Sequence, residues 1–453
     1  MMKKPIMLIL LLLQALPLLS QSRVITVKEC IDIALQNHPD YFASIEEQKK
    51  SIFELKGVRS QKSIIINGEI RTIETEKETE TTTSGIKIPG KDTDIGLFAG
   101  LTLYYPVYDA RKDYEEEISK LHIDMTKLKS QSTRLDIIFE VKNAYYGYLM
   151  AKSILVIRED IYRRNLKKVE LARQLFEGGS RPILDLSKAE VDLADAQLQY
   201  EMAKNTERKM KMNLFHAMGL EESDEVEIEP VEIKSMPVVS VSLDELYRIS
   251  YIYSPSIRSI SLEKRLALLK ISYESAAHYP RVNIQVGLGY ELDKIRGAAN
   301  PEDNVNSRNW SPVFYGLFQM TIPVYSGGGI TSKVESAESE YNRIEFKDRE
   351  IIIQTKNQIR DCYRSLEDIN RQLEISALIM KNAERHLLLA QKNYDNGGGS
   401  LLELQDAEVA VIKARMVYQE ARYNYLIILA RLSQLIGTGE EYICGDSAKK
   451  ISQ

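Results

Sequence analysis

The sequence predicts a mainly α-helical protein with membrane β-structure, built from two duplicated halves that each carry one β-hairpin and two long helices. Residue patterns recur after a nearly constant 218 positions. Each half also contains segments in which every second residue is apolar, which is typical of strands. Two stretches without proline, 110–177 and 329–395, are long enough to form helices of about 100 Å at 1.5 Å per residue.

The duplication is clearest in two heptad seams, where residues that favour close helix packing alternate at spacings of three and four. Their members are Leu186, Ala189, Leu193, Ala196, Tyr200 and Ala203, and then Leu404, Ala407, Val411, Ala414, Tyr418 and Ala421. We therefore predict a first repeat over 21–220 and a second repeat over 242–437. A linker at 221–241 joins them, and a tail follows at 438–453.

Strand alternation is most regular over 282–291, where apolar residues are separated by polar residues or glycine. It predicts one hairpin per repeat, at about 63–105 and 281–322. The polar segments 74–92 and 292–311 between the strands predict long extracellular loops. Aromatic residues near the strand ends predict a girdle at the membrane interface: Tyr104, Tyr105, Tyr290, Trp310 and Tyr315.

Helix signals frame these hairpins in the same order in both repeats. Each repeat opens with a capping-box pattern, Thr26 with Glu29 and Ser242 with Glu245. The helices that we expect to follow span 40–60, 110–177 and 183–218 in the first repeat and 256–278, 329–395 and 400–436 in the second. Glycine-rich turns separate each long helix from the helix that returns beside it.

Residues 1–20 have the pattern of a signal peptide. Lys3 and Lys4 precede the apolar run 6–13, and Ser20 is a small residue of the kind that precedes a cleavage site. The alternative is an uncleaved membrane anchor, but the run is shorter than the roughly 20 apolar residues that a membrane-spanning helix needs. Cleavage would change the net charge from −5 to −7 by removing two lysines. An acidic chain is not expected to bind nucleic acid, because phosphate binding needs a basic face.

Four strands per chain are too few to seal themselves in lipid. About eight strands are the minimum for a closed barrel, and open sheet edges are not tolerated in a bilayer. Several copies must therefore contribute strands, and three copies would supply twelve, which lies within the known range for outer-membrane barrels. The long helices would pair as coiled coils and continue the barrel as a hollow tube.

The chain resembles the TolC-like outer-membrane efflux proteins. The resemblance rests on the duplicated plan, on PVYDAR at 106–111 and PVYSGG at 323–328, and on two blocks that flank the helical turns. These blocks read LARQLFEGG followed by ILDLSKAEVDLADAQLQY, and LAQKNYDNGGGSLLELQDAEVAVIKARMVY. The resemblance implies a homotrimer in contact with outer-membrane lipid, with a trimeric 12-stranded outer-membrane β-barrel that continues as a periplasmic α-helical coiled-coil barrel. It also implies a periplasmic membrane-fusion adaptor and an inner-membrane pump of RND or ABC type as partners, in a Gram-negative type of envelope.

The helical turns are the candidate contact with the adaptor. The residues assigned to this tip are Gly178, Gly179, Ser180, Gly397, Gly398, Gly399 and Ser400. They depart from the Tyr-x-x-Gly-Leu-like tip motif of the family, which leaves the adaptor's identity open. Asp185, Glu403 and Asp406 follow the turns and are candidates for a gate that closes the tube at rest. The alternative is that they favour the positive ends of their helices.

The predicted function is export or efflux from the periplasm, or through a tripartite pump. A secreted structural coiled-coil protein is the alternative, although it does not explain the hairpins. We expect no enzyme activity, no cofactor and no metal site, because no nucleophile–base pair or ligand spacing stands out. Cys30, Cys362 and Cys444 are too far apart for a metal motif. Drug, metal ion and protein all remain open as cargo.

Overall fold

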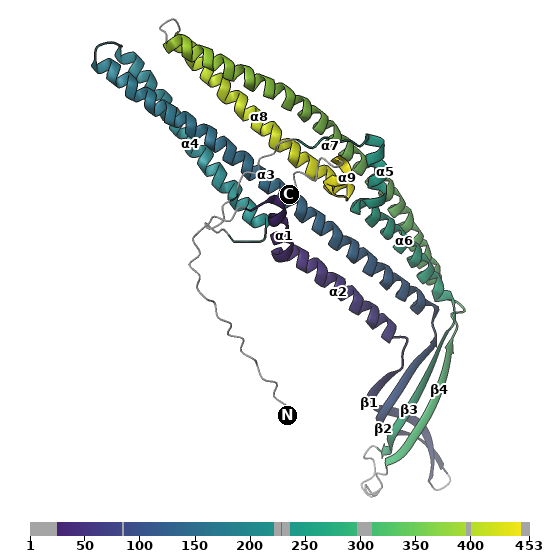
Figure 1. Ribbon diagram of the computed structural model, residues 1–453. Helices are drawn as coiled ribbons and strands as arrows, with labels where there is room; N and C mark the ends of the chain where they lie inside the picture. Colours follow the sequence, from purple (N-terminus) through teal and green to yellow (C-terminus); the bar gives the residue numbers. More distant parts are fainter. Residues whose placement is uncertain are drawn as a thin grey trace, which may run out of the picture.

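The computed structural model describes residues 25–83, 86–221, 228, 236–296, 310–395 and 400–444. The molecule is elongated, with a β-sheet at one end and the far ends of two pairs of long helices toward the other (Figure 1). The fold agrees with the prediction of a mainly helical chain with a small four-stranded antiparallel sheet.

Both predicted repeats begin with a short capped helix and a longer helix whose first residue is proline. α1 (Val27–Asn37) starts at a complete capping box, in which the Glu29 carboxylate accepts the Thr26 amide at 2.8 Å. α2 (Pro39–Ser60) follows. In the second repeat, α5 (Leu243–Tyr253) precedes α6 (Pro255–Ser275), which ends in the 3-10 turn η1 (Ala276–His278).

The long helices form two hairpins that lie side by side in Figure 1. Their bounds are α3 (Ala110–Glu177), α4 (Ile183–Ala217), α7 (Gly329–Asp395) and α8 (Leu401–Ile436). α2 packs on the part of α3 near the sheet, α6 packs on α7 and α3, and α8 packs on α3. None of the described helices has the combination of length and apolarity that a transmembrane helix requires.

The four strands pair antiparallel in the order β1-β2-β3-β4. They are β1 (Ile65–Thr83), β2 (Ile86–Tyr108), β3 (Arg281–Arg296) and β4 (Trp310–Thr321). The prediction of a polar loop over 74–92 is wrong, because β1 and β2 stay paired as far as Thr83 and Ile86. That segment is rich in threonine, a β-branched residue that suits strands even without an apolar face. The second predicted loop is shorter than 292–311, and its residues 297–309 lie outside the described chain.

The largest core lies at mid-length, where α1, α5, α8 and the short helix α9 (Glu440–Cys444) meet α3 and α7. Tyr145, Leu214 and Leu432 are fully buried there. The described part of the predicted linker, Ile228 and residues 236–241, also packs on this core. Its Ile228 is buried and accepts a hydrogen bond from Lys152 Nζ at 3.0 Å, while α9 and the linker meet where Ser240 N donates to Ile443 O at 3.1 Å. The linker and the start of the predicted tail thus join the two repeats.

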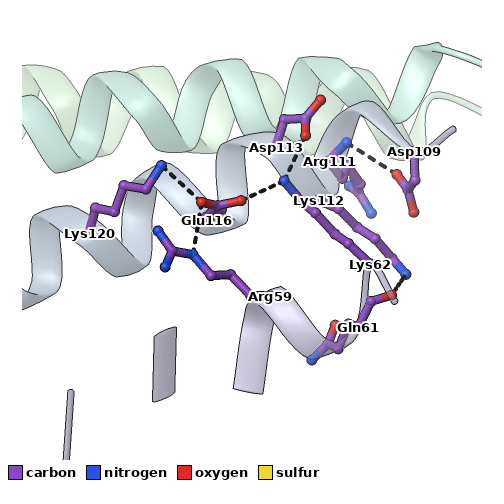
Figure 2. A network of polar contacts seen from close by, with 9 residues as sticks. All are labelled: Arg59, Gln61, Lys62, Asp109, Arg111, Lys112, Asp113, Glu116 and Lys120. Atoms are coloured by element: carbon purple, nitrogen blue, oxygen red, sulfur yellow. Dashed lines mark hydrogen bonds and ion pairs between the residues drawn. The ribbon is translucent and has the colours of Figure 1, made fainter. Parts of the chain in front are cut away.

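A polar network joins α2 to α3 beside the sheet (Figure 2). The Glu116 carboxylate contacts Lys62 Nζ at 2.8 Å, Lys120 Nζ at 2.9 Å and Arg59 Nε at 3.2 Å. Lys62 also contacts Asp113 at 2.7 Å. These cations, Lys62 above all, hold the pKa of Glu116 at about 2, below its ordinary value of 4.5.

Candidate functional site

One face of the sheet is a continuous apolar surface. The register places Leu101 opposite Leu288 and Leu288 opposite Phe314, and alternation puts Ile70 on the same face. Ile70 is 80% exposed and Phe314 is 72% exposed, so no described part of the chain covers them. A sheet surface of this kind suits contact with lipid.

The opposite face of the sheet is polar and internally hydrogen-bonded. Thr102 Oγ1 donates to Glu69 Oε2 at 2.6 Å, and Tyr104 Oη donates to Asn283 Oδ1 at 2.8 Å. Arg71 lies on this face, two residues after Glu69 on β1. An apolar outer face and a polar inner face are the features of an outer-membrane barrel wall.

Two aromatic rings on the polar face lie over glycines, a feature that the sequence prediction missed. Phe98 is only 3% exposed, and a Cβ added to Gly100 or Gly289 would stand 2.8 or 2.9 Å from its ring. The Tyr315 ring covers Gly287 in the same way and meets Phe98 edge-on at 6.1 Å. Glycines at alternate strand positions were the available clue, since they leave room for a large neighbour.

The predicted aromatic girdle divides between the two faces. Tyr105, Tyr290 and Trp310 lie on the apolar face and are exposed. Tyr104 and Tyr315 lie on the polar face, so their assignment to a lipid interface is wrong. Adjacent positions such as 104 and 105 must point to opposite sides of a sheet, which closeness to a strand end does not reveal.

The first helical tip is closed by glycine. Gly179 adopts φ +71°, a left-handed conformation that glycine adopts without strain. Its amide donates to Phe176 O at 2.9 Å, and the Ser180 amide donates to Leu175 O at 2.8 Å. This is the Schellman arrangement, and Gly178 is the C-cap residue of α3. Gly178, Gly179 and Ser180 thus form the turn, which is exposed.

Of the residues assigned to the second tip, the structure describes only Ser400. Ser400 is exposed and precedes α8, and its carbonyl accepts the Leu404 amide at 3.3 Å. Gly397, Gly398 and Gly399 lie outside the described residues.

The three candidate gate carboxylates occupy different surroundings within one chain. Asp185 lies in the first turn of α4 and faces Arg181 at 3.7 Å. Glu403 is exposed in the first turn of α8. Asp406 lines a cavity of about 520 Å³ between the two hairpins, and Asp185 does not line this cavity. The two carboxylates therefore do not share one site within the described chain.

Direct polar contacts cross between the hairpins at that cavity. Lys168 Nζ on α3 contacts Glu408 Oε2 on α8 at 2.6 Å, and both residues line the cavity. Lys188 Nζ on α4 donates to Gln405 Oε1 at 3.3 Å. The sequence prediction missed these contacts, although Glu408 is only two residues beyond Asp406. At the cavity, these two contacts join the hairpins through polar side chains.

Comparison with known proteins gives a consistent result. The model of the outer membrane efflux protein family matches residues 97–220 and 247–438. The alkaline protease secretion protein AprF of Pseudomonas aeruginosa is 22% identical over 415 residues, which cover 90% of this chain and 84% of AprF. The outer membrane protein TolC of Escherichia coli is 22% identical over 362 residues, covering 76% of this chain and 70% of TolC.

The fold is also that of a solved channel. The CmeC outer membrane channel of Campylobacter jejuni superposes with a TM-score of 0.74 at 16% identity, covering 94% of this chain and 89% of CmeC. At this level of identity the likeness concerns the fold. The match to the family model is the stronger finding, because its two segments cover more than half of the chain. The chain therefore belongs to the outer membrane efflux protein family.

Proposed function

We propose that this chain is one protomer of an export channel in the cell outer membrane. The observation that carries the proposal is the sheet, which is apolar on one face, polar on the other and open at both edges. Within the described chain β1 and β4 each pair on one side only. Unpaired strand edges are too costly in lipid, so neighbouring copies must pair with them. Three copies close a twelve-stranded barrel.

The helical hairpins extend this barrel into the periplasm. The chain supplies a water-filled path and no covalent chemistry. Channels of this plan need energy from elsewhere, and we propose a periplasmic adaptor together with an inner-membrane pump of RND or ABC type. The relatives include an alkaline protease secretion protein and a toluene efflux pump outer membrane protein, which supports both protein and small-molecule cargo.

The helical tips are the proposed docking surface for the adaptor. Gly178, Gly179 and Ser180 form an exposed turn at the end of the α3–α4 hairpin, and Ser400 lies at the corresponding end of α8. An exposed turn with a fixed backbone suits a partner that approaches end-on. Opening of the tube would then be a population shift toward the docked arrangement.

Fractionation and conductance test the proposal. The mature protein should partition with the outer membrane, migrate by electrophoresis as a larger and slower species before heating than after it, and produce unitary current steps in planar lipid bilayers. A protein that stays in the aqueous fraction without detergent and gives no current steps would instead be a secreted structural protein.

A further inference from the structure

The polar face of the sheet carries one row of side chains that crosses all four strands. The strand register aligns Arg71 on β1, Phe98 on β2, Glu291 on β3 and Ser311 on β4 at one level. Two charges of opposite sign thus flank one aromatic ring. We call Arg71, Phe98, Glu291 and Ser311 the collar row.

Packing fixes the centre of the collar row. Phe98 is buried against the backbone at Gly100 and Gly289, where any larger residue would collide with its ring. Tyr315 supports the same ring edge-on at 6.1 Å. A ring held from two sides is a stable platform for its neighbours.

Arg71 uses this platform. Its guanidinium lies 5.7 Å from the centre of the Phe98 ring, within the range of a cation–π contact. The side chain is nevertheless 45% exposed, so its charge stays accessible to ions. Glu69 Oε1 approaches Arg71 Nε only to 3.9 Å, and Glu69 is itself held by Thr102. Arg71 is therefore oriented mainly by the ring and not by a tight ion pair.

We infer that the collar row determines the ion selectivity of the barrel. The inference rests on the proposed function, because three copies are needed to repeat the row around a lumen. Each copy then presents one fixed cation and one carboxylate at the same depth. Accessible charges at that depth attract or repel permeating ions. This effect is easiest to observe at low salt, where the charges are screened least.

Single-charge variants separate the two contributions. Trimers of Arg71→Gln, Glu291→Gln and Arg71→Lys would be reconstituted in planar bilayers, and the reversal potential measured across a tenfold KCl gradient. Arg71→Gln should raise the K⁺ to Cl⁻ permeability ratio about twofold, and Glu291→Gln should lower it to a similar extent. Arg71→Lys restores the charge and should bring the ratio back toward that of the unmodified channel.

The outcomes separate this inference from the channel proposal. If the unmodified protein gives no current, the channel proposal fails and the inference fails with it. If all proteins conduct but the Gln variants leave the reversal potential unchanged, or shift it in the same direction, only the collar row is refuted. Phe98→Leu provides a second arm that keeps both charges. In the Phe98→Leu background the Arg71 guanidinium is no longer held at one position. Arg71→Gln should therefore change the permeability ratio less in this background than in the unmodified channel.

Discussion

Glu116 lies where α2 and α3 approach the sheet, and three cations surround its carboxylate (Figure 2). Such a network stabilises more than an isolated surface pair, because one carboxylate satisfies several donors. We predict that Glu116→Gln lowers stability by about 1 kcal/mol at neutral pH. The loss should be seen as a lower thermal transition of the purified protein in detergent.

The dependence on pH follows from the lowered pKa of Glu116. A carboxyl whose pKa falls on folding stabilises the protein above its unfolded pKa and loses that effect as it becomes protonated. The difference between Glu116→Gln and the unmodified protein should therefore be full above about pH 4.5 and fade toward pH 2. Glu117→Gln, at the next and exposed position of α3, is the matched control and should change little. A difference that persisted unchanged at pH 2 would contradict this account of Glu116.

The gate carboxylates make a second prediction at this scale. Asp185, Glu403 and Asp406 lie near the tips, and neutralising all three with Asn or Gln should alter single-channel conductance or ion selectivity. Asp185 faces Arg181. If these carboxylates served only as favourable charges at the helix starts, both properties would stay unchanged. Unchanged conductance and selectivity would therefore reject a gate role.

Residue types predicted the turns better than the contacts between distant residues. A glycine after a long helical pattern implied the left-handed turn that Gly179 makes. The contact of Lys168 with Glu408 joins residues 240 positions apart and depends on how two hairpins pack sideways. The heptad pattern defines which side of a helix packs but not which neighbour it meets, so this contact had no clue in a single sequence.

At the level of elements, helices were predictable and strand ends were not. The predicted helix 110–177 coincides with α3, because no proline interrupts it and a glycine follows it. The alternation of apolar residues revealed the strands only where one face is apolar. Beyond residue 73, β1 has no such alternation, so the pattern stopped before the hydrogen-bonded ladder did.

The two helical hairpins provide the prediction for this scale. Lys168 and Glu408 are both largely shielded and in contact at 2.6 Å across the hairpin seam. Lys168→Glu places a second carboxylate opposite Glu408, and the two negative charges repel each other. We therefore predict looser hairpins and a larger open-channel conductance. Glu408→Lys should act similarly, and the double exchange should restore the unmodified conductance because the pair forms again with its charges reversed.

A matched exchange distinguishes this seam from general surface effects. Arg163 and Glu159 form an exposed ion pair within α3 and do not join the hairpins. Exchanging their charges should leave conductance near its original value, since exposed pairs of this kind contribute little. If the Lys168 and Glu408 variants behaved like this control, the contact would not restrain the hairpins.

At the scale of the whole molecule, the middle of the chain forms a closed core, whereas its sheet has an uncovered face and unpaired edges. The mid-length core joins both repeats, α9 and the linker into one packed unit. The sheet, in contrast, leaves its apolar face uncovered and its outer strands half paired. This contrast was foreseen from strand count alone, because four strands cannot close. Which residues of the linker are buried was not, since Ile228 lies in a segment without periodicity.

The central claim is that copies of this chain complete one another's sheet. The mass of the purified mature protein in detergent, measured by light scattering with the detergent contribution subtracted, tests it most directly. We predict three chains per particle, with separation into single chains only after the barrel is unfolded by heat. A particle of one chain with its sheet still folded would contradict the claim, because the unpaired edges of β1 and β4 would then need no neighbour.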